Sequence, residues 1–519
     1  MDRLARVRAC LHAAAPGMCC AMGCGEKIML TRRAALGGMF ASVGQVALAE
    51  APVASLRPLL RPDRALARRT AAELVADARI SGKTGFVVAN ARTGEILDAL
   101  NPVLAMPPAS VTKTLTTQYA LEALGPTHRF VTRLIATGPV TDGRLEGDLV
   151  LLGGGDPHLD TTGLAEMAAA LKATGLREIA GRFLVSGGGF PHVARIDPDQ
   201  PDYLGYNPAV AGLNLNLNRV HFEWKREGDG WDVSMDARTE SYRPDVTLAR
   251  MEIVDRKFPV YTYSNGGRTE RWTVAENALG KGGSRWLPVR QPELYAGEVF
   301  QSLLRTHGIV LPRAILAERV GVGTVLVRRF SPPLAEILRS LLKHSTNLTA
   351  EVAGLSASRA RGLEPEDLAQ SAEAMTGWLR DRMGLRHPEF VDHSGLSDRS
   401  RISPADLVAM LLRTGPDSTL ASLLKPMRIH DDKGNLVPDS TLRLNAKTGT
   451  LNFVSALAGF LYRDQADPLA FAIFAADMPR RAAIRPEDRE RPAGAKGWNS
   501  RAVRLKWQLL DLWGAREPV

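Results

Sequence analysis

Cysteine is scarce in this chain and confined to its beginning. The 519 residues contain four cysteines, which are Cys10, Cys19, Cys20 and Cys24. The rest of the chain therefore has neither a disulfide framework nor a cysteine-ligated zinc site, and no histidine stands at a suitable spacing to complete a metal site with the early cluster. A cysteine-free chain needs no redox management in an oxidising compartment, which is consistent with export.

Long runs of one kind of residue are also missing. The formal net charge is +10, yet the arginines are dispersed and no five basic residues stand in a row. Without a recognisable nucleic-acid module we expect no nucleic-acid partner, and an anionic wall or membrane environment explains the charge equally well. The apolar run within residues 34–49 is too short for a membrane-spanning helix and contains Gln45.

The first fifty residues have the plan of a secretory signal. Thr31-Arg32-Arg33 precedes a short apolar segment that ends in Ala47-Leu48-Ala49, a small-x-small cleavage site. The paired arginines resemble a twin-arginine export signal, so we interpret residues 1–49 as a cleaved signal region and expect a periplasmic protein. In this interpretation translation begins at Met29, and residues 1–28 are not part of the signal. The alternative is an ordinary amphipathic N-terminal helix.

A serine and a lysine stand one helical turn apart near position 110. Ser110 and Lys113 occupy positions i and i+3, after Pro107-Pro108 and ahead of a continuing apolar face. A serine is a weak nucleophile until a neighbouring base takes its proton, and a neutral lysine can do so. The pair alone also fits a capped surface helix, since about one Ser-x-x-Lys is expected by chance in a chain of this length.

The pattern of apolar residues divides the remaining chain into two regions. From about 126 to 325, short apolar strands alternate with turn clusters, and neither glycine triplet in this region is followed by the Gly-Lys-Ser/Thr of a phosphate loop. We therefore predict a strand-rich insert over 126–325, within a domain formed by 50–125 and 326–519. In that domain we expect helices over 53–80, 333–343, 367–383, 404–412 and 500–513, and strands over 84–90, 95–100, 451–460 and 468–475.

Two further polar motifs follow in the C-terminal region. They are Ser345-Thr346-Asn347 and Lys447-Thr448-Gly449. An earlier Lys83-Thr84-Gly85 precedes the serine helix, so we interpret it as a strand-leading turn. Asp392-His393-Ser394 suggests a hydrolytic triad, but three neighbours in a tight loop point apart and do not form a proton relay. The closing helix is expected to pack on the sheet, with a peripheral membrane contact as the alternative.

Taken together and in order, the three motifs match the Ser-x-x-Lys, Ser-x-Asn and Lys-Thr-Gly signature of serine penicillin-recognising enzymes. The wide interval between Ser110 and Ser345 leaves room for an insert, and the stretches 153–157, 206–216 and 392–404 also look familiar. The chain resembles the D-alanyl-D-alanine carboxypeptidase/endopeptidases of the peptidase S13 (DacB, penicillin-binding protein 4) family over essentially all of residues 50–519. The resemblance implies an α/β (α+β) fold: a β-lactamase/transpeptidase-like domain with helices on an antiparallel sheet, split by a strand-rich insert.

The resemblance implies a role for each motif residue. Ser110 attacks the carbonyl between two D-alanines and forms an acyl-enzyme, with Lys113 as its general base. Ser345 passes a proton to the departing amine, and Asn347 holds the substrate backbone. Lys447 supplies positive charge for the terminal carboxylate and for the protonation state of Lys113.

The same resemblance implies substrate-binding residues. Thr448 and Gly449 border the bound peptide, with the Thr448 hydroxyl on its terminal carboxylate, and the Thr450 N–H forms an oxyanion hole with that of Ser110. Asp202, from the insert, is matched loosely to an acidic residue that contacts the amino end of the stem-peptide side chain.

The implied partners are peptidoglycan stem peptides and β-lactam inhibitors, with no metal or organic cofactor and no stable membrane span. A serine β-lactamase shares the motifs but has to deacylate quickly, and the large insert argues against it. A non-catalytic β-lactam sensor or wall-binding module is the other alternative, and the intact set of polar side chains argues against that. The sequence leaves open the choice between carboxypeptidase and endopeptidase, the oligomeric state and the export route.

Overall fold

The computed structural model describes residues 69–431 and 434–515. The expected signal region, the four cysteines and most of the helix expected over 53–80 lie outside the described residues. The described chain begins with helix α1 (Ala71–Asp77), where Thr70 and Glu73 form a reciprocal capping box. None of the helices in these ranges is long and apolar enough to cross a membrane.

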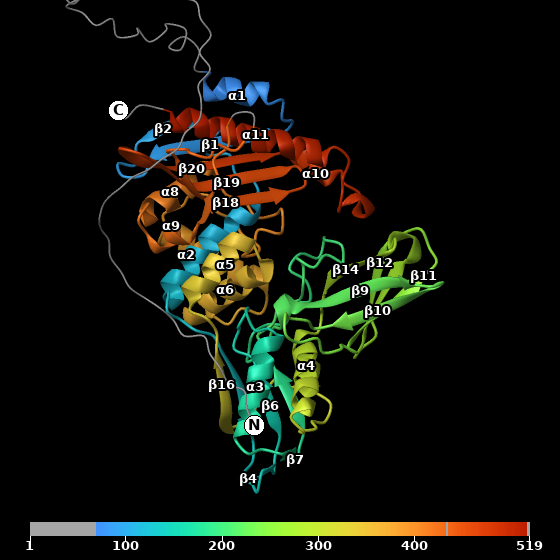
Figure 1. The fold of residues 1–519 in the computed structure, drawn as a ribbon. Coiled ribbons are helices and arrows are strands. Elements are labelled where there is room, and N and C mark those ends of the chain that lie inside the picture. Colours follow the sequence, from blue (N-terminus) through green and yellow to red (C-terminus); the bar gives the residue numbers. More distant parts are fainter. Residues whose placement is uncertain (1–68, 432–433, 516–519) are drawn as a thin grey trace, which may run out of the picture. The chain divides into compact units, whose positions relative to one another are not determined.

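A six-stranded antiparallel sheet joins the two ends of the described chain. Its order is β17 (Lys425–Met427), β18 (Arg443–Leu451), β19 (Val454–Arg463), β20 (Ala466–Ala476), β1 (Lys83–Asn90) and β2 (Ile96–Leu100). The predicted hairpin of 84–100 is present as β1 and β2, and its turn is held by the Asn90 side chain, which accepts from two backbone N–H groups. Strand β1 pairs with β20, so residues almost 400 positions apart lie side by side (Figure 1).

Helices cover both faces of this sheet (Figure 1). On one face lie α1 and α11 (Ala495–Gly514), packed on alternate residues of β20 such as Phe471 and Ile473. The opposite face, with Ala472 and Phe474, packs on a cluster of helices. These are α2 (Thr112–Leu124), α5 (Leu334–His344), α6 (Asn347–Ala360), α7 (Leu368–Asp381), α8 (Pro404–Thr414) and α9 (Thr419–Leu423). Because both faces are buried, β19 and β20 appear in the sequence as continuous apolar runs.

The segment between α2 and α5 forms sheets of its own. The largest has the order β15 (Ile315–Leu316), β8 (Phe183–Ser186), β6 (Leu149–Leu152), β3 (Val131–Ala136) and β16 (Thr324–Phe330). Three-stranded sheets combine β9 (Arg219–Glu227), β10 (Gly230–Asp236) and β14 (Gly282–Pro288), then β11 (Ala249–Val254), β12 (Tyr261–Asn265) and β13 (Glu270–Ala275), and finally β4 (Val140–Thr141), β5 (Arg144–Leu145) and β7 (Glu178–Ile179).

Two helices also belong to this segment, α3 (Thr161–Ala173) and α4 (Pro292–Thr306), and they pack in one core with these sheets. The sequence predicted a strand-rich insert here without these two helices, because the short strands dominated the apolar pattern. Strand β16 crosses the expected boundary at 325/326 and pairs with β3. The domain boundaries at 125/126 and 325/326 stay predictions.

Candidate active site

Ser110 lies on a short 3-10 turn that leads directly into α2. The turn spans Ala109–Val111, and Ala109 has a left-handed φ of 47°. The Thr112 hydroxyl donates to the Ala109 carbonyl at 2.9 Å and so fixes the turn from within. Strand β18 lies tightly against it, because a Cβ at Gly449 would come 2.4 Å from the Pro108 carbonyl oxygen. The sequence predicted a helix N-terminus at Ser110, and in the structure Ser110 lies two residues before Thr112, the first residue of α2.

The Lys113 side chain is fully buried directly behind Ser110. Its Nζ lies 2.9 Å from the Ser110 Oγ, 2.8 Å from the Asn347 Oδ1 and 2.6 Å from the Ser394 carbonyl oxygen. Burial, helped by the positive charge of Lys447, lowers the Lys113 pKa to about 7, against the opposing charges of Asp392 and Glu351. A large fraction of Lys113 is therefore neutral at physiological pH and able to accept a proton.

Ser345 and Asn347 occupy the junction between two helices. Helix α5 ends at His344, Ser345 takes a left-handed φ of 60°, and α6 begins at Asn347. The Asn347 Nδ2 donates to the Tyr206 carbonyl at 2.8 Å, so a loop between β8 and β9 contacts the site through its backbone. The sharp reversal at Ser345 brings its hydroxyl and the Asn347 amide to the same side of the helix pair.

Lys447 approaches the same group from strand β18. Its Nζ donates to the Ser345 Oγ at 3.0 Å and to the Thr448 carbonyl at 2.9 Å. Burial, with the charge of Lys425, lowers the Lys447 pKa to about 8. The structure thus brings Ser110, Lys113, Ser345, Asn347 and Lys447 together, as the sequence predicted.

Alternation along β18 separates its next three residues. Lys447 and Gly449 are buried, whereas Thr448 and Thr450 are exposed. Thr450 lines a cavity of about 440 Å³ together with Ser110, Ser345 and Asn347. Gly449 lies against the Ser110 turn, where its missing Cβ would meet the Ser110 nitrogen at 3.1 Å. Thr448 is exposed and does not line the cavity.

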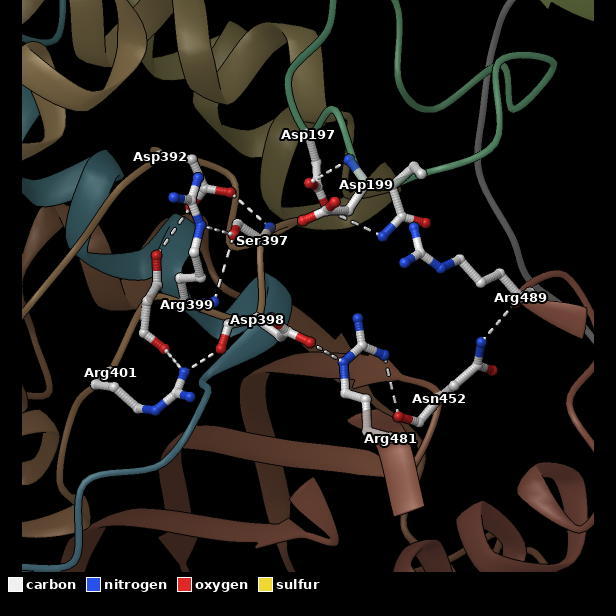
Figure 2. A network of polar contacts seen from close by, with 12 residues as sticks. Asp197, Asp199, Asp392, Ser397, Asp398, Arg399, Arg401, Asn452, Arg481 and Arg489 are labelled. Atoms are coloured by element: carbon white, nitrogen blue, oxygen red, sulfur yellow. Dashed lines mark hydrogen bonds and ion pairs between the residues drawn. The ribbon is translucent and has the colours of Figure 1, made fainter. Parts of the chain in front are cut away.

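The far wall of this cavity carries charges of both signs that the sequence analysis missed. Figure 2 shows Asp197 and Asp199 facing Arg481 and Arg489 across it. Asp197 is already engaged, since its carboxylate accepts from the Asp199 N–H at 3.1 Å and from the Gln200 amide at 3.0 Å. Within the described part of the chain, no hydrogen bond or ion pair engages the Asp199 carboxylate.

The basic side of the cavity is held by a chain of polar contacts (Figure 2). Arg481 pairs with the Asp398 carboxylate and donates to the Asn452 carbonyl at 3.1 Å. The Asn452 amide then donates to the Arg489 carbonyl at 2.7 Å. Residues 398, 452 and 481 come together only in the folded chain, so no spacing in the sequence indicates this wall.

Asp202 does not line the cavity. Its carboxylate pairs with Arg195 at 2.6 Å, and its backbone carbonyl accepts from Arg290 at 2.7 Å. The acidic residues that the loop does bring to the cavity are Asp197 and Asp199. The role of Asp202 stays a prediction without geometric support.

The Asp392-His393-Ser394 stretch packs against the back of the site. The His393 ring pairs with the Ser371 hydroxyl at 2.8 Å, while the Asp392 carboxylate accepts from the N–H groups of Gly395 and Ser397. The three side chains therefore have separate partners, and the contribution of this stretch to Lys113 is the Ser394 carbonyl. In the described ranges no three His, Cys, Asp or Glu side chains gather closely enough to hold a metal ion.

Comparison with known proteins gives a consistent result. The model of the D-Ala-D-Ala carboxypeptidase 3 (S13) family matches residues 67–491. The D-alanyl-D-alanine carboxypeptidase DacB of Haemophilus influenzae is 24% identical over 411 residues, which are 75% of this chain and 84% of that relative. The D-alanyl-D-alanine carboxypeptidase of an Actinomadura species is 28% identical over 432 residues, 75% of this chain and 77% of its own length.

A solved structure has the same fold. The crystal structure of penicillin binding protein 4 (dacB) from Haemophilus influenzae superimposes with a TM-score of 0.69 at 20% identity, over 86% of this chain and 100% of that one. A second structure of that protein, with a TM-score of 0.66 at 20% identity over the same shares of both chains, is complexed with a β-lactam. The predicted fold class, mixed helices and antiparallel sheet of the penicillin-binding type, is confirmed.

Proposed function

This chain belongs to the D-Ala-D-Ala carboxypeptidase 3 (S13) family, and we propose that it hydrolyses D-Ala-D-amino-acid bonds of peptidoglycan stem peptides through an acyl-enzyme on Ser110. The observation that carries the proposal is the buried Lys113 amine, 2.9 Å from the Ser110 hydroxyl. A serine beside a base of matched pKa is what nucleophilic attack on an amide requires.

Acylation begins with proton transfer from Ser110 to neutral Lys113. The Ser110 Oγ attacks the D-Ala carbonyl, and the backbone N–H groups of Ser110 and Thr450 stabilise the oxyanion. Each such donor contributes about 3 kcal/mol to the transition state in comparable sites. The arrangement of β18 against the Ser110 turn supports this pairing of donors.

Release of the leaving group uses the second cluster of the site. Ser345, which receives a hydrogen bond from Lys447 at 3.0 Å, passes a proton to the departing amine. Lys447 attracts the terminal carboxylate of the substrate, and Asn347 borders the peptide backbone. Thr448, which is exposed outside the cavity lining, stays a predicted partner of that carboxylate. Water then hydrolyses the acyl-enzyme. β-Lactams mimic the same amide and trap Ser110.

The charged cavity wall suggests which side chain the enzyme accepts. Asp199 offers a free carboxylate, and Arg489 presents a guanidinium with no hydrogen bond or ion pair to other described residues. Such a pair of opposite charges fits a stem-peptide side chain that ends in both an amino and a carboxylate group. We assign Asp199, in place of Asp202, to the amino end.

Matched variants test this assignment. Asp199→Asn raises the KM for a stem peptide with a free side-chain amine by about tenfold, the loss expected for one charge-assisted hydrogen bond. The same variant leaves the KM for the N-acetylated peptide unchanged. Asp202→Asn serves as the control and changes neither value. A larger effect of Asp202→Asn on the amine peptide contradicts the assignment.

Product analysis tests the reaction itself. Purified protein is incubated with a pentapeptide stem and with a cross-linked dimer, and free D-Ala and monomer are quantified by mass spectrometry. Release from the wild type but not from Ser110→Ala supports the proposal, and the relative rates separate carboxypeptidase from endopeptidase. If penicillin is instead turned over rapidly while both peptides stay intact, the β-lactamase alternative holds.

The site of action follows from the substrate. Cross-linked stem peptides lie outside the cytoplasmic membrane, so we propose a periplasmic enzyme exported by the signal in residues 1–49, a region outside the described residues. Fractionation of cells expressing the full chain, with Arg32→Lys and Arg33→Lys together as the control, tests the twin-arginine route.

A further inference from the structure

We infer that Glu351 is a positioning residue that fixes the direction of the Lys113 lone pair toward Ser110, acting through the Ser394 carbonyl. The inference rests on the proposed function, since it concerns the base of that reaction. It concerns a side chain that does not line the cavity and cannot touch the substrate.

The geometry of the neutral Lys113 amine decides which neighbour faces its lone pair. Such an amine has two N–H bonds and one lone pair in a tetrahedral arrangement. The Asn347 Oδ1 at 2.8 Å and the Ser394 carbonyl at 2.6 Å are acceptors only, so they take the two N–H bonds. The remaining direction faces the Ser110 Oγ at 2.9 Å, and the lone pair is aimed at the proton it has to accept.

Asn347 is itself locked in the orientation that this requires. Its Nδ2 donates to the Tyr206 carbonyl at 2.8 Å, which leaves the Oδ1 for Lys113. One of the two acceptors is therefore oriented by the loop between β8 and β9. The second acceptor, the Ser394 carbonyl, needs a separate support because it belongs to a loop.

Glu351 provides that support. Its Oε2 accepts from the His393 N–H and its Oε1 from the Ser394 N–H, each at 2.9 Å. The side chain is completely buried, and it lies one turn after Asn347 on α6, so a single helix controls both acceptors. These N–H groups belong to the two peptide units on either side of His393, so Glu351 fixes the backbone up to the Ser394 Cα, from which the carbonyl extends to Lys113.

The rest of the loop is tied to the same helix. The Asp392 carboxylate accepts from the Gly395 N–H at 3.0 Å and the Ser397 N–H at 2.8 Å. The His393 ring packs on α6 at Gly354, where any Cβ would come 2.1 Å from the ring. The Gly395 N–H belongs to the same peptide unit as the Ser394 carbonyl, so Asp392 holds that unit from its other end, while Glu351 ties the two preceding units to α6.

The charges around Lys113 separate this inference from a simple charge effect. Lys447 on β18, Asp392 on the loop and Glu351 on α6 are the groups that act on it, and the carboxylates raise the Lys113 pKa where they are ionised. Burial and Asp392 in turn raise the Glu351 pKa to about 8. Glu351 is therefore largely uncharged below that pH, so Glu351→Gln removes little charge where Lys113 titrates and leaves the acid limb of the acylation rate in place.

The test measures the second-order rate of acylation by a fluorescent penicillin between about pH 5 and about pH 9. Glu351→Gln cannot accept from both N–H groups, because one amide atom is a donor. We expect acylation to be about 10- to 100-fold slower, the effect of a misplaced catalytic group, with the acid limb near its original pH. Glu351→Asp keeps both acceptor oxygens but falls one methylene short, so it also slows acylation without moving the limb.

Glu270→Gln is the matched control. Glu270 is also fully buried, and it accepts from two consecutive N–H groups, those of Arg290 and Gln291, at 2.7 and 2.9 Å. Its loss disturbs folding in a similar way without touching the loop that carries Ser394, so the acylation rate per labelled molecule stays at the wild-type value. Endpoint labelling with excess penicillin counts the folded, active fraction of each variant.

Two results overturn the inference. One is a wild-type rate of acylation in Glu351→Gln. The other is a reduced labelled fraction with a normal rate per labelled molecule, which means that Glu351 serves folding alone. Failure of the proposed function is recognised separately, because wild-type protein then takes up no label.

Discussion

At the scale of single residues, the account depends on the proton that Lys113 accepts. Burial and Lys447 together lower its pKa to about 7. For a base, the reactive form is the neutral one, so acylation rises with pH through this value and reaches a plateau above it. The charge of Lys447 is thus part of the activation of Ser110, in addition to its proposed attraction of the substrate carboxylate.

Lys447→Ala tests this coupling. Without the neighbouring positive charge, protonated Lys113 becomes more stable, its pKa rises, and the acid limb of acylation moves to higher pH. Glu351→Gln, which is expected to leave the limb in place, serves as the comparison. The measurement is the pH profile of penicillin acylation, and an unmoved or oppositely moved limb contradicts the role of Lys447.

The sequence predicted the site unevenly at this scale. Ser110, Lys113, Ser345, Asn347 and Lys447 were identified, because each stands in a short motif with a fixed order. Asp199, Arg481 and Arg489 were not, since loop folding alone brings them to the cavity. Glu351 had a readable signal: it stands four residues after Asn347, on the same face of a helix.

At the scale of elements, the site depends on the close approach of β18 to the Ser110 turn. Gly449 makes this possible because the strand backbone meets the Pro108 carbonyl, where a Cβ would come within 2.4 Å. The backbone of both elements has to move if a side chain is added. The oxyanion donors, one from each element, then separate.

Gly449→Ala is therefore expected to lower the acylation rate by about 100-fold, the scale of losing one oxyanion donor. Stability falls less, by about 1–3 kcal/mol, as for other overpacked positions. Acylation kinetics and thermal unfolding measure the two effects. Gly497→Ala, on the exposed side of α11 with Arg501 at 3.8 Å from its added Cβ, is the control: it leaves acylation unchanged and raises stability by about 0.5–1 kcal/mol, as Gly→Ala does within a helix. Normal acylation in Gly449→Ala contradicts the proposed pairing of donors.

The elements themselves were predicted with different success. Strand β1 and helix α5 have clear periodicity and matched their expected ranges within two residues. Helices α3 and α4 were missed, because alanine-rich and mixed sequences between strands carry a weaker signal than the strands do. Sheet order was beyond prediction: the pairing of β1 with β20 joins distant segments and depends on the whole core.

At the scale of the whole molecule, the family assignment from three motifs is confirmed by the match over residues 67–491. Motif order carried this prediction, since each motif alone is common.

The core behind the site becomes less stable at low pH. His393 is buried against α6, and burial lowers its pKa to about 3.

The sign of this effect on stability follows from proton binding. Below about pH 6.5 the unfolded chain protonates His393 while the folded chain does not, so the contribution is present above that pH and is lost as the pH falls toward 3. The loss is about 1.4 kcal/mol per pH unit in this window. His393→Gln, which keeps a partner for Ser371, is expected to flatten the dependence of Tm on pH between about 6.5 and about 4. An equally steep dependence in the variant shows that other groups govern the acid transition.

The central claim is that Ser110 is the nucleophile. The most direct measurement is intact-mass and peptide-mapping analysis of the protein after incubation with penicillin. The account predicts one added penicillin per molecule, located on the peptide that contains Ser110, and none on Ser110→Ala. An adduct that persists on the Ser110→Ala protein, or that maps to Ser345 or Ser394, contradicts the claim.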